Sequence, residues 1–134
     1  MFREIDELES IGDCCFSIAR MLSRKRRTGV GHFTQWQMEQ IRRMESYVSD
    51  ALTLMTETLQ QPEGEGHDIS RSYSLEHQIN NLRTQLRNDN LQNIASGLYD
   101  YKLGVFYIDL INELEKLGDY ILNVVQCKAR QRRV

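Results

Sequence analysis

The stretch ELEKLGDY at residues 113–120 is almost repeated near the start of the chain as ELESIGDC at residues 7–14. The similarity covers nine ungapped positions, 5–13 against 111–119, of which six are identical. An internal repeat constrains the fold because each copy is expected to form the same structural unit. The chain is therefore expected to contain two related helical segments, one near each end.

The composition indicates a single helical domain. The 134 residues are 40% hydrophobic and 27% charged, with one proline and a net charge of −2. Few turn-forming residues and weak strand patterns favour an all-α fold, and the nearly balanced charge does not favour a nucleic-acid partner. No apolar run approaches the ~20 residues that span a bilayer. The acidic start at residues 1–10 is unlike a signal peptide. Three cysteines, two of them adjacent, match neither a disulfide framework nor a zinc motif, so reduced thiols are expected.

Apolar residues recur at intervals of three and four through most of the chain, which is the spacing of amphipathic helices. This pattern predicts four helices with the approximate bounds 2–24, 33–60, 70–96 and 100–128. Four amphipathic helices joined by short loops pack most simply as an antiparallel four-helix bundle. We therefore expect one all-α domain over residues 1–134. The residues expected to face inward from the first helix are Ile5, Leu8, Ile11, Cys15, Ile18 and Leu22.

The helix boundaries carry recognisable signals. Thr34 and Gln37 have the spacing of a capping box at the start of the second helix. The sequence PEGEGHD at residues 62–68 predicts a surface loop. The third helix is expected to end at Ser96 and Gly97, after Leu91 and Ile94 have continued its apolar stripe, and Asp100 is expected to cap the fourth.

The repeated stretch places two carboxylates four residues apart in each copy: Glu9 with Asp13, and Glu115 with Asp119. Residues at this spacing share a helix face, where like charges repel. A positive partner is therefore expected, which could be an arginine from a neighbouring helix, a hydrated cation or a bound metal. Oxygen ligands alone suit magnesium, calcium, manganese or iron rather than zinc. A solvated, salt-bridged face is the alternative, because the Glu-x-x-His motif of di-metal bundles is absent from the sequence.

Gly12 and Gly118 occupy the same position in the two copies. Glycine inside a helix costs about 1 kcal/mol relative to alanine. The usual compensation is the close approach of another backbone, so we expect both glycines to mark a tight crossing between the two repeated helices.

The stretches ELESIGD and ELEKLGD resemble the signature of the PhoU family, written approximately LERIGD and followed by an N-x-A segment. Here Ser17-Ile18-Ala19 follows the first copy and Asn123-Val124-Val125 the second. The resemblance covers most of the chain and implies a fold built from PhoU-like helical repeats. The chain would open inside one repeat and end inside another, like a piece of a longer protein. It is most similar to the PhoU-like cytoplasmic region that follows the membrane domain of bacterial sodium/phosphate cotransporters.

This resemblance implies a non-enzymatic domain that regulates phosphate transport at the cytoplasmic face of the inner membrane, with the membrane domain of the transporter as its partner. Some family members bind iron or other divalent metals through the Glu-x-x-x-Asp stretches. The matching positions here are Glu9, Asp13, Glu115 and Asp119. A further acidic position falls at Glu76, but Asn80 stands where the family often has aspartate.

Three functions are left open by the sequence: a regulatory domain of a phosphate transporter, a carboxylate metal-binding bundle, and a helical adaptor that forms homo-oligomers. Two basic runs follow the repeated helices, and in an antiparallel bundle they should lie at opposite poles, where one flat membrane could not contact both. We interpret them as solvated helix ends. Their members are Arg24, Lys25, Arg26 and Arg27, and Lys128, Arg130, Arg132 and Arg133.

Overall fold

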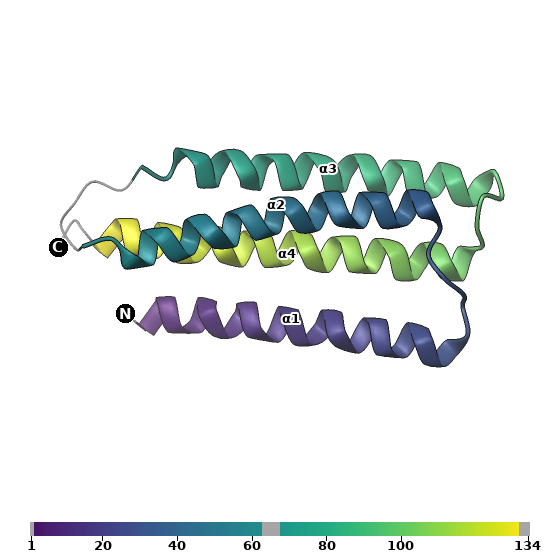
Figure 1. Ribbon diagram of the computed structural model, residues 1–134, viewed down its shortest axis with the longest axis horizontal. Helices are drawn as coiled ribbons and strands as arrows, with labels where there is room; N and C mark the ends of the chain where they lie inside the picture. Colours follow the sequence, from purple (N-terminus) through teal and green to yellow (C-terminus); the bar gives the residue numbers. More distant parts are fainter. Residues whose placement is uncertain (1, 63–67, 132–134) are drawn as a thin grey trace.

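The computed structural model describes residues 2–62 and 68–131 of the chain. All regular structure in these residues is helical. Successive helices run in opposite directions along one common axis (Figure 1). The predicted all-α antiparallel bundle is thereby confirmed. Its helices are α1 (Phe2–Thr28), α2 (Gln35–Gln60), α3 (Ser70–Ala95) and α4 (Tyr101–Gln131).

Two helices are longer than the sequence predicted. Helix α1 continues to Thr28, so the first basic run forms its last turn, where cations interact favourably with the helix dipole. Gly29 and Gly31 then leave the helix with φ values of 66° and 95°, which side chains other than glycine rarely adopt. Helix α4 continues to Gln131. Arg132 and Arg133, and the predicted loop at 63–67, lie outside the described residues.

The predicted helix caps are confirmed. Thr34 Oγ1 accepts the Gln37 backbone N–H at 3.1 Å, and Gln37 Oε1 accepts the Thr34 N–H at 2.9 Å, which completes the capping box. The break between α3 and α4 falls at residues 96–100, as predicted. Asp100 Oδ1 accepts the backbone N–H of Leu103 at 2.9 Å and so caps α4.

Helix α4 is the centre of the bundle because it packs against all three other helices. Helices α2 and α3 also pack against each other, whereas α1, among the described helices, packs only against α4. The fold is therefore a three-helix core with α1 laid along one side of α4 (Figure 1). The largest side chains that the core encloses completely are Tyr107, Met44, Ile79, Leu86, Ile111 and Ile121.

The predicted inward face of α1 is wrong in part. Ile5, Leu8, Cys15 and Leu22 are exposed, and the buried residue of this helix is Cys14. The reason is that a single neighbouring helix covers only one edge of the apolar stripe. Helices α2 and α4, which have two or more neighbours, bury far more of their apolar residues.

In α3 the predicted continuation of the stripe at Leu91 is also wrong, since this side chain is 62% exposed. Asn90 is buried in its place. Its Nδ2 donates to the Gly104 carbonyl at 3.2 Å and its Oδ1 accepts the Tyr99 hydroxyl at 2.6 Å. These hydrogen bonds satisfy a polar side chain inside the α3–α4 contact.

The two repeated glycines do not mark a crossing between the repeated helices. A Cβ added at Gly12 would meet nothing within 4 Å, and one added at Gly118 would lie 3.0 Å from Cδ1 of Ile79 on α3. The tightest position is Gly104, where an added Cβ would lie 2.8 Å from Cγ1 of Ile94. Close approach in this fold therefore joins α4 to α3 rather than to α1.

Candidate functional site

The carboxylates of the second motif copy face α3. Glu115 Oε2 lies 2.8 Å from Nε of Arg83, and Glu76 from α3 lies next to Asp119. Glu76 Oε1 in turn accepts a hydrogen bond of 2.6 Å from Asn80 Nδ2. We call Glu76, Glu115 and Asp119 the carboxylate cluster. The arginine beside it is one of the three positive partners that the sequence left open.

Arg83 compensates the carboxylate cluster only in part. Burial, followed by the negative charges of Glu115 and Glu76, raises the pKa of Asp119 to about 6, and Arg83 opposes this shift. Asp119 can also share a proton with Glu76 through a side-chain hydrogen bond. The α3–α4 face therefore holds a group that changes charge close to neutral pH.

The carboxylates of the first copy do not join this cluster. Glu9 and Asp13 are exposed on α1, which packs against the other side of α4. Asp13 lines a small pocket of about 100 Å³ together with Glu113 and Lys116. The structure thus brings Glu115 and Asp119 together with Glu76, and leaves Glu9 and Asp13 apart from them. Within residues 2–62 and 68–131, no group of three or more His, Cys, Asp or Glu side chains is arranged to hold a metal ion.

The first glutamate of each motif copy binds across the α1–α4 interface. Glu7 Oε2 accepts a hydrogen bond of 3.3 Å from Asn123 Nδ2. Its counterpart Glu113 accepts one of 3.3 Å from the Cys14 thiol and pairs with Lys116 at 3.2 Å. Neither glutamate was predicted from the sequence, because the prediction considered only the pairs of carboxylates four residues apart, which start at Glu9 and Glu115. The available signal was the heptad spacing from Glu7 to Cys14, which puts both on the side facing α4.

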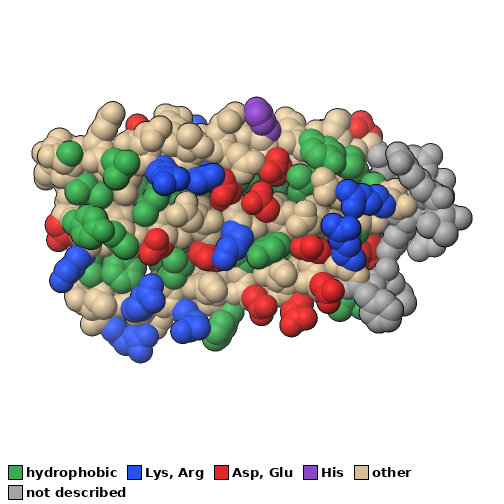
Figure 2. Space-filling model, turned by 180° about the vertical axis from the view of Figure 1, so that it is seen from behind, with side chains coloured by type: hydrophobic (Ala, Val, Ile, Leu, Met, Phe, Trp, Pro, Cys, Tyr) green, Lys and Arg blue, Asp and Glu red, His purple; other side chains and the backbone are tan. Residues whose placement is uncertain are grey.

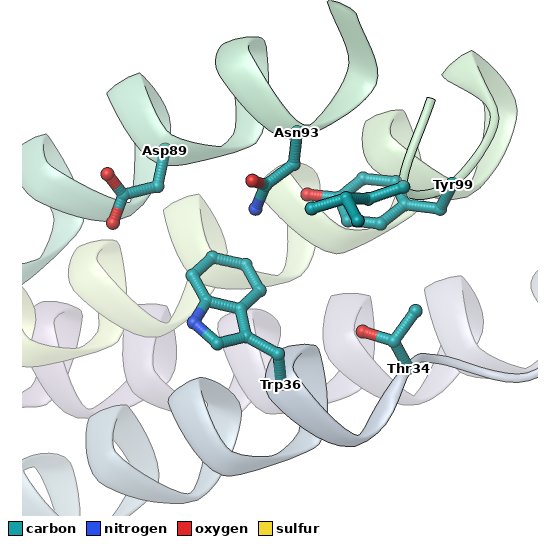
Figure 3. Close-up of a pocket in the computed structure, with 6 residues that line it drawn as sticks. Thr34, Trp36, Asp89, Asn93 and Tyr99 are labelled. Carbon is teal, nitrogen blue, oxygen red and sulfur yellow. The ribbon is translucent and has the colours of Figure 1, made fainter. Parts of the chain in front are cut away.

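A second cavity, of about 470 Å³, lies at the end of the bundle where α2 begins and α3 ends. Figure 3 shows the Trp36 indole between the side chains of Asp89 and Asn93 on α3 and that of Thr34 before α2, with Tyr99 closing one end. This cavity was not predicted from the sequence. The one feature of the sequence that marks the place is its single tryptophan, Trp36, which lies beside the start of a helix.

The bundle-end cavity rests on buried aromatic residues. The rings of Trp36 and Tyr107 have centroids 5.8 Å apart. Tyr107 is fully buried, and its hydroxyl has no hydrogen-bond partner among the described residues. Burial raises the pKa of Tyr107 well above its usual range. Apolar walls with a few polar groups can hold a small molecule.

Comparisons with protein-family models, with curated proteins and with solved structures gave no match. Among the described residues, no helix combines the length and the apolar character needed to cross a membrane.

Proposed function

We propose that this chain is a non-catalytic, PhoU-like regulatory domain that acts on a sodium-dependent phosphate transporter at the cytoplasmic face of the bacterial inner membrane. The observation that carries the proposal is the pairing of the two motif-bearing helices. The first glutamate of each copy bonds to the opposite helix, Glu7 to Asn123 and Glu113 to Cys14. The motif is thus used twice to hold the two repeated helices together, which supports a structural role for it in a fold built from related helical units.

The state of the charged groups supports a scaffold rather than an enzyme. Burial and the neighbouring Glu113 raise the pKa of the Cys14 thiol to about 12, which keeps it protonated and unreactive. Glu115 is held by Arg83, and Glu113 by Lys116. Each of these groups therefore has a structural partner within the bundle.

The proposal is tested by phosphate uptake in the bacterial cells that encode this chain. Rates of sodium-dependent uptake of radiolabelled phosphate would be compared between cells with the intact coding region, cells in which residues 1–134 are deleted, and cells carrying Glu7→Ala with Glu113→Ala. We expect the deletion and the double variant to change the uptake rate, or its repression by external phosphate, in the same direction. Unchanged uptake in the deletion strain would overturn the proposal.

Metal binding by the carboxylate cluster is the second candidate function. The observation in its favour is that Asp119, with a raised pKa, lies beside two further carboxylates. Against it, no group of three or more such side chains in the described residues is arranged to hold a metal ion, and the Arg83 guanidinium already pairs with Glu115. Elemental analysis of protein purified without chelator would decide between them. One equivalent of metal that is lost in Glu115→Gln with Asp119→Asn, but kept in Glu9→Gln with Asp13→Asn, would establish a metal site. Metal-free wild-type protein would exclude it.

A further inference from the structure

Beside the face that contacts α4, helix α1 carries an apolar stripe that the described helices cover only in part. Its members alternate at intervals of three and four residues, which is the spacing of a coiled-coil seam. Ile5 at one end is 54% exposed and Leu22 at the other end 43%. We call this set the α1 stripe; all of its members are exposed: Ile5, Leu8, Gly12, Cys15, Ala19 and Leu22.

The α1 stripe matches itself when one copy is reversed. Two antiparallel α1 helices can cross at the level of Asp13 and Cys14. Each residue of the α1 stripe then lies opposite a stripe residue of the second copy, because the two residues of every pair are equally far from this crossing point. The pairs are Ile5 with Leu22, Leu8 with Ala19, and Gly12 with Cys15 of the second copy. Small residues therefore lie at the centre, where two helices can approach closely, and large side chains cover the ends.

The charges of α1 are complementary in the same orientation. Acidic residues outnumber basic ones before Cys14, and every charged residue after it in the helix is basic. Figure 2 shows this division along its lower edge, where α1 lies: red side chains gather toward one end and blue side chains toward the other. An antiparallel pair sets the acidic half of each copy against the basic half of the other, whereas a parallel pair would oppose like charges. The acidic residues are Glu4, Asp6, Glu7, Glu9 and Asp13, and the basic residues of the second half are Arg20, Arg24, Lys25, Arg26 and Arg27.

One pair of charges flanks the α1 stripe closely enough to set its register. Glu9 follows Leu8 directly, and in the antiparallel crossing it lies level with Ile18 of the second copy, two residues before Arg20. The long side chains of Glu9 and Arg20 can therefore meet, once on each side of the two-fold axis. The Arg20 guanidinium is 5.8 Å from the ring centroid of Phe16, which is itself 65% exposed. This aromatic–arginine pair borders the same face and extends the surface available for contact.

We propose that two copies of this chain associate through the α1 stripe as an antiparallel, two-fold symmetric pair of α1 helices. A second copy is the occupant that the surface specifies, since both the side-chain sizes and the charges are self-complementary about one point, as an isologous interface requires. This association does not depend on the role in phosphate transport, so either proposal can fail without the other.

Sedimentation equilibrium of the full chain tests the association. We expect a reversible monomer–dimer equilibrium between roughly 1 and 500 µM, the range suited to a small interface. Ala19→Arg should abolish the dimer, because Ala19 is exposed in the monomer but lies against Leu8 in the pair. Ala95→Arg, at an exposed alanine on α3, is the matched control and should dimerise like the wild type. A wild-type chain that stays monomeric throughout, or a dimer that Ala19→Arg leaves intact, would overturn the proposal.

Charge reversal tests the antiparallel register. Glu9→Arg and Arg20→Glu should each weaken the dimer roughly tenfold, because each contact occurs twice and attraction becomes repulsion. The double variant should restore wild-type affinity, since it recreates both pairs with the signs exchanged. Thermal unfolding followed by circular dichroism checks that these exposed substitutions leave the fold intact. A double variant as weak as the single variants would refute this register.

Discussion

Nε of Arg83 on α3 lies 2.8 Å from Oε2 of Glu115 on α4, which ties the two helices together beside the carboxylate cluster. The Arg83 side chain is 29% exposed and that of Glu115 16%. This pair is therefore less screened by solvent than a surface ion pair. The repeated Glu-x-x-x-Asp spacing required a positive partner, and in the second copy that partner is an arginine from the neighbouring helix.

Replacing Arg83 should destabilise the fold in a manner that depends on pH. We expect Arg83→Gln to lower the free energy of unfolding at pH 7 by about 1 kcal/mol, since three carboxylates lose their neighbouring cation. The part of the loss that comes from Asp119 should diminish as the pH falls below about 6, where this carboxylate becomes protonated. Urea unfolding followed by circular dichroism measures the effect. Arg87→Gln, at an exposed arginine one turn further along α3, should change stability little; equal losses in the two variants would contradict the prediction.

Removing the charge of Asp119 should stabilise the protein. Its pKa is raised from 3.8 to about 6 in the fold, so the folded state binds more protons than the unfolded state between these values. Stability therefore falls as the pH rises from about 4 to about 6, and the cost is complete above that range. We expect Asp119→Asn to gain roughly 1–3 kcal/mol at pH 7 and to gain nothing below pH 4.

Unfolding of the Asp119→Asn variant should be measured at several pH values in the presence of a chelator. Asp13→Asn is the matched control, because this exposed residue holds the same position in the first motif copy. It should shift stability by less than about 0.5 kcal/mol. If Asp119→Asn is less stable than the wild type at pH 7, the prediction is contradicted, because the charged carboxylate would then stabilise the fold.

The three helical glycines should respond differently to alanine. Gly12→Ala should stabilise the chain by about 1 kcal/mol, since the added methyl meets nothing and alanine favours the helix. Gly104→Ala should destabilise it by about 1–3 kcal/mol, because the methyl would collide with Ile94 and press on Asn90. Gly118→Ala should fall between them. Thermal unfolding gives the order, and a different ranking would contradict the packing described for α4.

The three thiols should differ in reactivity. Cys15 is exposed, Cys127 is buried, and the pKa of the buried Cys14 is raised to about 12, chiefly by burial. We therefore expect one thiol per chain to react rapidly with Ellman's reagent at pH 8, and all three to react in denaturant. Cys15→Ser should eliminate the rapid phase. A rapid phase that persists in this variant would show that α1 leaves α4 readily.

Local signals predicted the helices well because caps and apolar periodicity act within a few residues. Thr34 with Gln37, and Asp100 with Leu103, form the hydrogen bonds that their spacing implies. The four-helix arrangement follows from such segments and is confirmed.

The packing partners were harder to predict, because periodicity shows that a face is apolar but not which helix covers it. The stripe of α1 was expected to be buried, yet Leu8 and Leu22 are exposed, since α1 has only α4 as a neighbour. The candidate site was likewise predictable in its local part but not in its contact with another helix. The motif identified Glu115 and Asp119 as a pair that requires compensation, but the contribution of Arg83, 32 residues away, depends on the contact between α3 and α4.

The dependence of α1 on α4 alone has a consequence for synthesis on the ribosome. The contact between Cys14 and Glu113 joins residues that are 99 positions apart, so α1 has no docking surface until α4 emerges. At roughly 5–20 residues per second, that interval lasts several seconds. During this time α2 and α3 can already meet, while the apolar side of α1 stays in water. Until α4 is made, α1 is therefore the helix of this bundle that is most open to chaperones and to α1 of a neighbouring nascent chain.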